Sequence, residues 1–270
     1  MEQNEETPPV TITVRGIELG RARPEIVVPL VGDDHETVLE QAQRACETPS
    51  RVVEWRLDHF RPDHADPAAH RAAVLETLPA LRGALGPDRA LLVTLRTTAE
   101  GGQREISDRN LLLLLEELMT PRRAGVQALV DLVDIEASRD PQTVAQVVEI
   151  ADRSGVKVIV SHHDFESTPS EEELVAILRS QRRAGADLPK IAVTPRGPRD
   201  VLTLLSASLT VAEDNAGPHI ALSMGPLGAV TRVAGETFAS AATFATAGRA
   251  SAPGQLAATD VAEVIEMLRP

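Results

Sequence analysis

The sequence has very little lysine, no tyrosine, and one residue each of cysteine and tryptophan. Its 270 residues include 27 basic side chains, but only Lys157 and Lys190 are lysines. The single cysteine, Cys46, cannot form an intrachain disulfide, which fits a reducing compartment. Nucleic-acid binding usually needs basic charge and often uses aromatic stacking. The lack of tyrosine and the net charge of −13 therefore argue against a nucleic-acid partner.

Long apolar runs and a signal-peptide pattern are missing as well. The run of leucines at 111–115 is followed at once by two glutamates, whereas a transmembrane helix needs about 20 apolar residues. The first residues, MEQNEE, are polar and acidic, unlike the basic and apolar regions of a signal peptide. We therefore expect no membrane association and a cytoplasmic location.

The scarcity of lysine makes the two lysines informative. Arginine replaces lysine wherever a solvated charge is enough, but guanidinium stays protonated and cannot attack a carbonyl. Lys157 opens a β-type run and can be explained as a charge at a strand edge. Lys190 lies inside the apolar run 188–193, where burial would lower its pKa. Lys190 is therefore a candidate Schiff-base nucleophile. The simpler alternative is a lysine whose ammonium reaches solvent or pairs with a carboxylate.

Strand-like and helix-like segments alternate along the chain. Apolar β-branched runs occur at 26–30, 52–57, 91–95, 129–135, 156–160, 191–194, 220–224 and, more weakly, 242–245. Helical spacing occurs between and after them, at 36–46, 67–85, 110–123, 141–154, 170–183, 199–212, 230–239 and 260–268. Eight strands alternating with eight helices predict an α/β fold of the (β/α)8 TIM barrel type.

The N-terminal residues predict an additional element. Two short β-type runs flank Arg15 and Gly16 within residues 10–20, which indicates a β-hairpin. We expect one domain over residues 1–270, with a hairpin segment at 1–24 and the barrel at 25–270. A doubly wound sheet is the second choice, because no G-x-G-x-x-G motif follows the first strand.

Ionisable residues gather at the ends of the predicted strands. Alternation places Glu54, Arg56 and Asp58 on one face of the second strand. Later strands add further ionisable side chains, namely Arg96, Asp134, Glu136, His163 and Lys190. Active sites of β/α barrels lie at the carboxyl ends of the strands. Each charge alone could be a solvated loop residue, but together they predict a site.

The histidines of the fifth strand favour acid–base chemistry over metal binding. His162 and His163 are adjacent, so their side chains should point to opposite faces and cannot easily share one ion. We expect no metal. If a metal were bound, Asp134 and Glu136 would be its carboxylate ligands. A lysine can condense with a ketone to an iminium, which acidifies the neighbouring carbon for removal of a proton by a histidine. Asp134 or Glu136 could orient that histidine.

The motifs resemble the type I 3-dehydroquinate dehydratase family. They occur in the family's order and span nearly the whole chain: EWRLD at 54–58, TLR at 94–96 with EGG at 100–102, DIE at 134–136, SHHDF at 161–165, PKIAV at 189–193, SMG at 223–225, TR at 231–232 with GE at 235–236, and SAPGQ at 251–255.

The resemblance implies dehydration of 3-dehydroquinate to 3-dehydroshikimate in the shikimate pathway, by a homodimeric barrel without metal or organic cofactor. Lys190 matches the Schiff-base lysine and His163 the general acid and base, with Glu136 or Asp134 near the histidine. The other matching positions are expected to contact the substrate, with Arg232 binding its carboxylate and the last two in a loop that closes over it: Glu54, Arg56, Arg96, Arg232, Ser251 and Gln255.

A few positions depart from the family pattern. Pro29 stands where many members have a serine, and Leu222 and Pro226 also differ. Two other functions remain open from the residues: another Schiff-base barrel lyase, such as a class I aldolase, and a barrel without catalytic activity that binds or regulates. The pair Arg232 and Gln255 suits a carboxylated ring better than a sugar phosphate.

Overall fold

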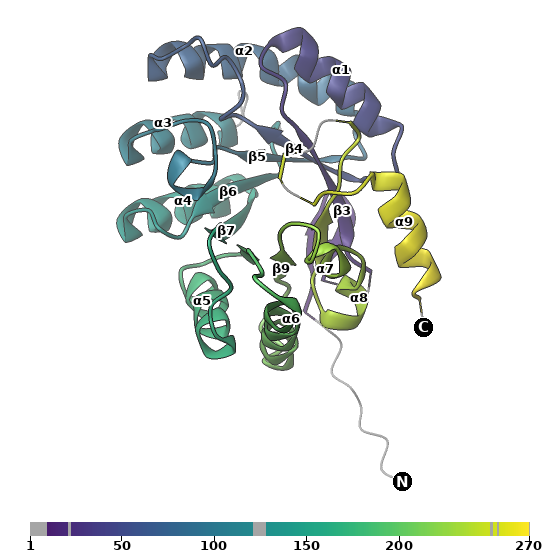
Figure 1. The fold of residues 1–270 in the computed structure, drawn as a ribbon. Coiled ribbons are helices and arrows are strands. Elements are labelled where there is room, and N and C mark those ends of the chain that lie inside the picture. Colours follow the sequence, from purple (N-terminus) through teal and green to yellow (C-terminus); the bar gives the residue numbers. More distant parts are fainter. Residues whose placement is uncertain (1–9, 21–22, 121–127, 249–250, 253, 270) are drawn as a thin grey trace.

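A computed structural model describes residues 10–20, 23–120, 128–248, 251–252 and 254–269. Within this part of the chain, one parallel sheet of eight strands curves into a barrel, in the order β10-β3-β4-β5-β6-β7-β8-β9. Helices follow the strands and cover the outside of the barrel (Figure 1). The structure confirms the expected β/α barrel with an N-terminal hairpin.

The strands have the following bounds: β1 Ile12–Val14, β2 Ile17–Leu19, β3 Glu25–Leu30, β4 Val52–Arg56, β5 Ala90–Thr94, β6 Leu132–Glu136, β7 Lys157–Asp164, β8 Leu188–Val193, β9 Ile220–Ser223 and β10 Ala242–Phe244. The helices have these: α1 His35–Cys46, α2 Pro67–Leu85, the short 3-10 helix η1 Thr98–Glu100, α3 Asp108–Met119, α4 Pro141–Ser154, α5 Glu171–Arg183, α6 Pro198–Glu213, α7 Ala229–Val233, α8 Gly235–Phe238 and α9 Ala258–Met267.

The barrel comes close to closing between its last strands. β10 pairs with β3 in parallel, whereas β9 and β10 are joined by a single bridge between His219 and Ser240. The amide of Ala241 also donates to the carbonyl of His219, at 2.8 Å. The two edges therefore meet at their N-terminal ends.

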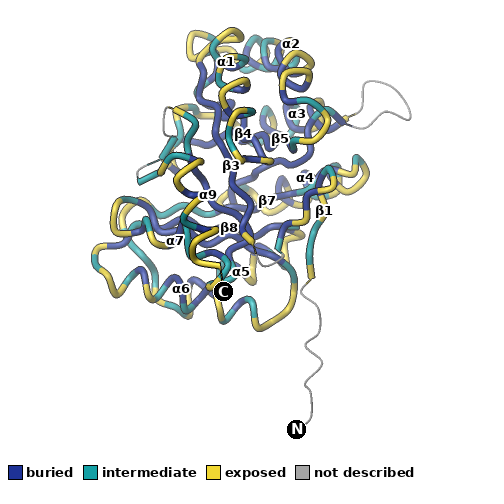
Figure 2. Tube along the Cα trace, turned by 90° about the vertical axis from the view of Figure 1, so that its right-hand side faces the viewer, coloured by how far each residue is buried: buried dark blue, intermediate teal, exposed yellow. Residues whose placement is uncertain are grey.

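Alternation along the strands separates two apolar layers. Outward-facing residues such as Val53 and Trp55 pack between strands and helices, which gives the buried centre visible as dark blue tube in Figure 2. Inward-facing residues near the strand starts, such as Val52 and Leu188, form a second apolar cluster together with hairpin residues. This cluster fills the amino-terminal end of the barrel interior and forms an apolar floor. Polar side chains nearer the carboxyl ends of the same strands lie above this floor.

The hairpin covers the amino-terminal end of the barrel. Ile17 and Leu19 are buried in the lower cluster. Arg15, in the turn, places Nε 2.7 Å from a carboxylate oxygen of buried Asp131, just before β6. Asp131 also accepts from Arg82 Nη1 at 3.0 Å and from the amide of Leu91 at 2.8 Å. An ion pair and apolar burial thus fix the hairpin to the barrel.

Helix starts follow the expected signals, but two expected helices differ in extent. Ser170 and Glu173 form a capping box at the start of α5. The helix expected at 110–123 ends at Met119, and 121–123 lie outside the described residues. The other difference is near the C-terminus. The segment 230–239, expected as one helix, is instead two short helices that meet at Ala234. Gly235 packs against Pro24 and the carbonyl of Ser240, so the chain turns there instead of continuing straight.

Among the described residues, no helix is long and apolar enough to cross a membrane.

Candidate active site

A cavity opens at the carboxyl ends of the strands, above the apolar floor of the barrel. It is lined by residues from several strands and from two C-terminal segments: Glu54, Arg56, Thr94, Arg96, Glu100, Gly101, His163, Phe165, Lys190, Ala192, Leu222, Met224, Arg232, Phe244, Ser251, Ala252 and Gln255. Of the residues expected at the site from the sequence, Asp58, Asp134 and Glu136 do not line this cavity, and all the others do. Among the described residues, no group of three His, Cys, Asp or Glu side chains could hold a metal ion.

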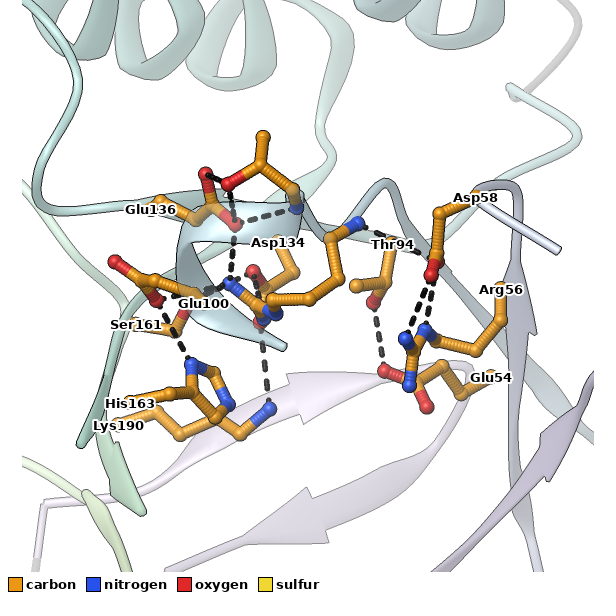
Figure 3. A network of polar contacts seen from close by, with 12 residues as sticks. Glu54, Arg56, Asp58, Thr94, Glu100, Asp134, Glu136, Ser161, His163 and Lys190 are labelled. Carbon is orange, nitrogen blue, oxygen red and sulfur yellow. Dashed lines mark hydrogen bonds and ion pairs between the residues drawn. The ribbon is translucent and has the colours of Figure 1, made fainter. Parts of the chain in front are cut away.

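The second barrel strand supplies Glu54 and Arg56, as its alternation predicted. Arg56 donates from Nε and Nη2 to the two oxygens of Asp58, both at 2.8 Å. Burial opposes the charge of Arg56, but this bidentate contact outweighs it and raises the pKa of the guanidinium. Thr94 Oγ1 donates to Glu54 at 2.7 Å. Both charged side chains are therefore fixed in the cavity wall before any ligand binds (Figure 3).

Arg96 is buried among three carboxylates. Its Nη2 lies 2.7 Å from Asp134, and its Nη1 lies 3.3 Å from both Glu100 and Glu136. Burial opposes its charge, but Asp134, then Glu100 and Glu136, raise the pKa of this guanidinium above its ordinary value. One cation thus holds three acidic side chains together in a place where none could remain ionised alone.

His163 contacts Glu100, a residue whose role the sequence left open. Its Nδ1 lies 2.9 Å from Glu100 Oε2, whereas the sequence suggested Asp134 or Glu136 as its partner. Glu136 instead accepts from the amide and hydroxyl of Thr97, at 2.8 and 3.0 Å, and pairs with Arg96. The expectation of a carboxylate beside His163 holds, but the carboxylate comes from η1 and not from β6.

A close backbone turn brings Glu100 to His163. The amide of Gly102 donates to the carbonyl of Thr97 at 2.7 Å, and a Cβ on Gly102 would lie 1.9 Å from the carbonyl oxygen of Arg96. Gly101 has a φ of 78° and lies under the ring of Phe165. Only glycine fits this turn. The pair Glu100 and Arg96, four residues apart, was the signal in the sequence that could have pointed to Glu100.

The charges of this pair are shifted toward neutral forms. Burial raises the pKa of Glu100 to about 7, and nearby Glu136 adds to this, so that Arg96 offsets it only in part. Burial, followed by the positive charges of Arg96 and Lys190, lowers the pKa of His163 well below its usual range. A neutral imidazole held through Nδ1 keeps Nε2 available for a proton on a ligand.

The two lysines lie in contrasting environments. Lys190 is 4% exposed, with Nζ 3.4 Å from Asp134 Oδ2 and 4.5 Å from the centre of the Phe244 ring. Burial lowers the pKa of Lys190, and Asp134 opposes this shift only in part. Gln181 bonds both the amide and the carbonyl of Lys190, each at 3.0 Å. Lys157 pairs with Asp187 at the surface, at 2.8 Å.

The remaining expected residues close the other side of the cavity. Arg232 is buried on α7 and donates from Nη1 to the carbonyl of Phe244, at 3.1 Å. Its burial lowers the pKa of the guanidinium to about 10. Ser251 and Gln255 bond each other twice, Ser251 N to Gln255 Oε1 at 2.9 Å and Gln255 Nε2 to Ser251 Oγ at 3.0 Å. Pro29, which departs from the family pattern, is not among the lining residues, whereas Leu222 is.

This fold and this site define a β/α-barrel enzyme with a buried lysine beside a histidine. A sequence model of the type I 3-dehydroquinase family matches residues 26–270. The chain therefore belongs to that family, whose members are hydro-lyases of the shikimate pathway.

Individual relatives agree with this assignment. The chain is 42% identical over 258 residues to 3-dehydroquinate dehydratase of Klebsiella pneumoniae subsp. pneumoniae, covering 95% of this chain and 98% of the relative. The Geobacillus kaustophilus 3-dehydroquinate dehydratase superposes with a TM-score of 0.88 at 38% identity, covering 97% of each chain. The Clostridium difficile type I enzyme, crystallised with covalently modified comenic acid, gives 0.87 at 36% identity, covering 96% of this chain and 97% of that one.

Proposed function

We propose that the protein dehydrates 3-dehydroquinate to 3-dehydroshikimate through a Schiff base on Lys190. The observation that carries this proposal is the burial of the Lys190 amine in the same cavity as His163. Burial lowers the pKa of Lys190 and so increases the fraction of neutral amine that can attack a ketone. The family match favours the dehydratase over a class I aldolase.

The reaction begins with the covalent bond. Neutral Nζ of Lys190 attacks the ketone carbon and forms a carbinolamine, and loss of one water from it gives the iminium. His163 takes the proton that the Lys190 ammonium loses when Nζ becomes neutral, and it donates that proton to the departing oxygen. The iminium then acidifies the neighbouring carbon, and His163 removes a proton from that carbon, which leaves a neutral enamine.

Elimination and release follow from the enamine. Its electrons expel the hydroxyl group at the β position, and His163 returns its proton so that the group leaves as water. One water then hydrolyses the conjugated iminium, which frees the enone product and restores Lys190. The sum is loss of one water from the substrate. Every step uses side chains of the cavity, so we expect no metal and no organic cofactor.

The other charged residues would bind and position. Arg232, with Ser251 and Gln255 in the neighbouring loop, would hold the substrate carboxylate, since a planar guanidinium suits bidentate contacts. Glu54, Arg56 and Arg96, which all line the cavity, would contact hydroxyl groups of the ring.

The carboxylates divide between two roles. Glu100 would support His163 when the imidazole carries a proton, because their atoms already lie within hydrogen-bond distance. Glu136 would act as a positioning residue through Arg96 and Thr97. From the same resemblance we propose that the protein is a homodimer in the cytoplasm. Light scattering coupled to gel filtration tests whether it is a dimer.

Borohydride trapping tests the covalent step. The protein is incubated with 3-dehydroquinate and sodium borohydride, and the adduct is located by intact mass and peptide mapping. Only Lys157 and Lys190 could carry it, so its position is nearly unambiguous. An adduct on Lys190, together with the absorbance of a conjugated enone in the untreated reaction, supports the proposal. The absence of an adduct would contradict the covalent step, and the absence of enone absorbance would contradict the dehydration.

A further inference from the structure

The ring of Phe244 lies next to the reactive amine. Phe244 ends β10, is 6% exposed, and has its ring centre 4.5 Å from Lys190 Nζ. The face of an aromatic ring carries partial negative charge, and it attracts a cation within about 6 Å of its centre. The ring therefore stabilises positive charge at the nitrogen that would form the Schiff base.

The other contacts of Lys190 Nζ show why the ring is important for stabilising its charge. Among the described residues, Asp134 is the one carboxylate within 4 Å of Nζ, at 3.4 Å. Asp134 is already shared with Arg96 at 2.7 Å and with Ser161 Oγ at 2.7 Å. A buried ammonium needs compensation for the hydration that it loses. The ring supplies part of it without accepting a proton and without competing for the ketone.

We propose that Phe244 is a positioning residue whose ring stabilises the cationic states of Lys190 Nζ, both the resting ammonium and the iminium formed from it. The iminium part of this inference rests on the proposed Schiff-base route. The ammonium part depends only on the geometry of Lys190 and Phe244. The two parts therefore call for separate measurements.

The charge on Nζ changes at defined stages of the proposed route. The carbinolamine nitrogen is neutral, and loss of water from it places positive charge on Nζ as the C=N bond forms. Removal of a carbon-bound proton by His163 returns an electron pair to nitrogen and gives the neutral enamine. The ring lowers the free energy of the iminium relative to both neutral species. It should therefore increase the iminium fraction present during turnover.

The backbone of Phe244 has a second contact that a test must preserve. Its carbonyl accepts from Arg232 Nη1 at 3.1 Å. Replacing the side chain leaves this carbonyl in place, so the ring can be altered without removing that contact. Fluorination is the mildest change, because each fluorine withdraws electron density from the ring face while the shape changes little. Mono-, di- and trifluorinated phenylalanine placed at 244 thus form a graded series.

The first measurement is the pKa of Lys190 in the free protein, by NMR titration of lysine labelled with 15N at Nζ. With two lysines in the chain, two signals are expected, and Lys157 is the internal control. We expect the pKa of Lys190 to fall stepwise, by roughly 0.5 to 1 from phenylalanine to the trifluorinated ring. The pKa of Lys157 should stay constant.

Phe60 provides the matched control position. It is also buried, but its ring packs edge-on against Trp55, with centroids 5.2 Å apart, and lies in the cluster between strands and helices. The same fluorinated residues at 60 should leave the pKa of Lys190 unchanged. Phe244→Leu, which removes the ring face, should lower that pKa at least as far as trifluorination does. An equal Lys190 pKa across the 244 series would overturn the inference.

The second measurement is the fraction of protein trapped by borohydride at saturating 3-dehydroquinate. We expect it to fall roughly three- to tenfold along the 244 series and to stay constant along the 60 series. If the unmodified protein gives no adduct, the Schiff-base proposal fails, and the Lys190 titration still decides the ammonium part. If it gives an adduct whose amount does not change along the 244 series, the ring does not act on the iminium and that part is wrong.

Discussion

Glu100 Oε2 lies 2.9 Å from His163 Nδ1, and Arg96 holds the same carboxylate at 3.3 Å. The carboxylate that supports the proposed acid and base therefore comes from a 3-10 turn after β5. Arg96 also pairs with one carboxylate oxygen of Asp134, and Lys190 contacts the other oxygen. The histidine and the lysine therefore belong to one connected network (Figure 3).

Replacing Glu100 by glutamine should lower kcat and change its pH dependence. Burial raises the pKa of Glu100 to about 7, so the carboxyl loses its charge as the pH falls through 7 and then supports a protonated imidazole less well. We expect the wild-type rate to fall below that pH, and the variant to be roughly tenfold or more slower and to lack this limb. Steady-state rates from pH 5 to 9 measure it.

Glu172→Gln, on the exposed face of α5, is the matched control and should leave the profile unchanged. An acid limb near pH 7 that persists in Glu100→Gln would show that another group controls it.

The two lysines should respond very differently to substitution. Lys190→Arg keeps a positive charge beside Asp134 but has no neutral amine, so it should abolish both turnover and borohydride trapping. Lys157→Ala removes an ion pair with Asp187 at the surface, where the Lys157 side chain is 37% exposed. This change should leave kcat within about twofold of the wild-type value. Substantial activity in Lys190→Arg would refute the covalent mechanism.

The sequence predicts most of this site because strand alternation is simple. Glu54 and Arg56 share a face since side chains two apart on a strand point the same way, and Lys190 stands out by composition alone. Glu100 was missed because it lies in a turn whose shape depends on how Gly102 crosses the backbone of Arg96. The ring of Phe244 was missed because β10 is short and its contact with Lys190 depends on barrel closure.

Removing the charge of Arg96 should destabilise the fold as well as the site. Arg96→Met leaves Glu100, Asp134 and Glu136 buried without their shared cation. Breaking a buried ion pair from one side costs about 3–5 kcal/mol, and we expect a loss of this size in the free energy of unfolding by urea at pH 7.5. Arg153→Met, from an exposed pair with Glu149, should cost about 1 kcal/mol or less. Equal losses in the two variants would contradict this account of Arg96.

The N-terminal hairpin should depend on Asp131 more than on Arg15. Asp131 is buried and meets Arg15, Arg82 and the amide of Leu91, so Asp131→Ala leaves two cations and an amide uncompensated and should cost about 3–5 kcal/mol. Arg15 has a φ of 48°, which glycine adopts without strain. Arg15→Gly therefore removes a partly solvated ion pair with Asp131 and an exposed hydrogen bond to the carbonyl of Pro87, and should cost only about 1 kcal/mol. Urea unfolding measures both. Because the active site lies at the opposite end of the strands, kcat of the folded fraction should be unchanged in either variant, and a selective loss of kcat would show that the hairpin end is coupled to the site.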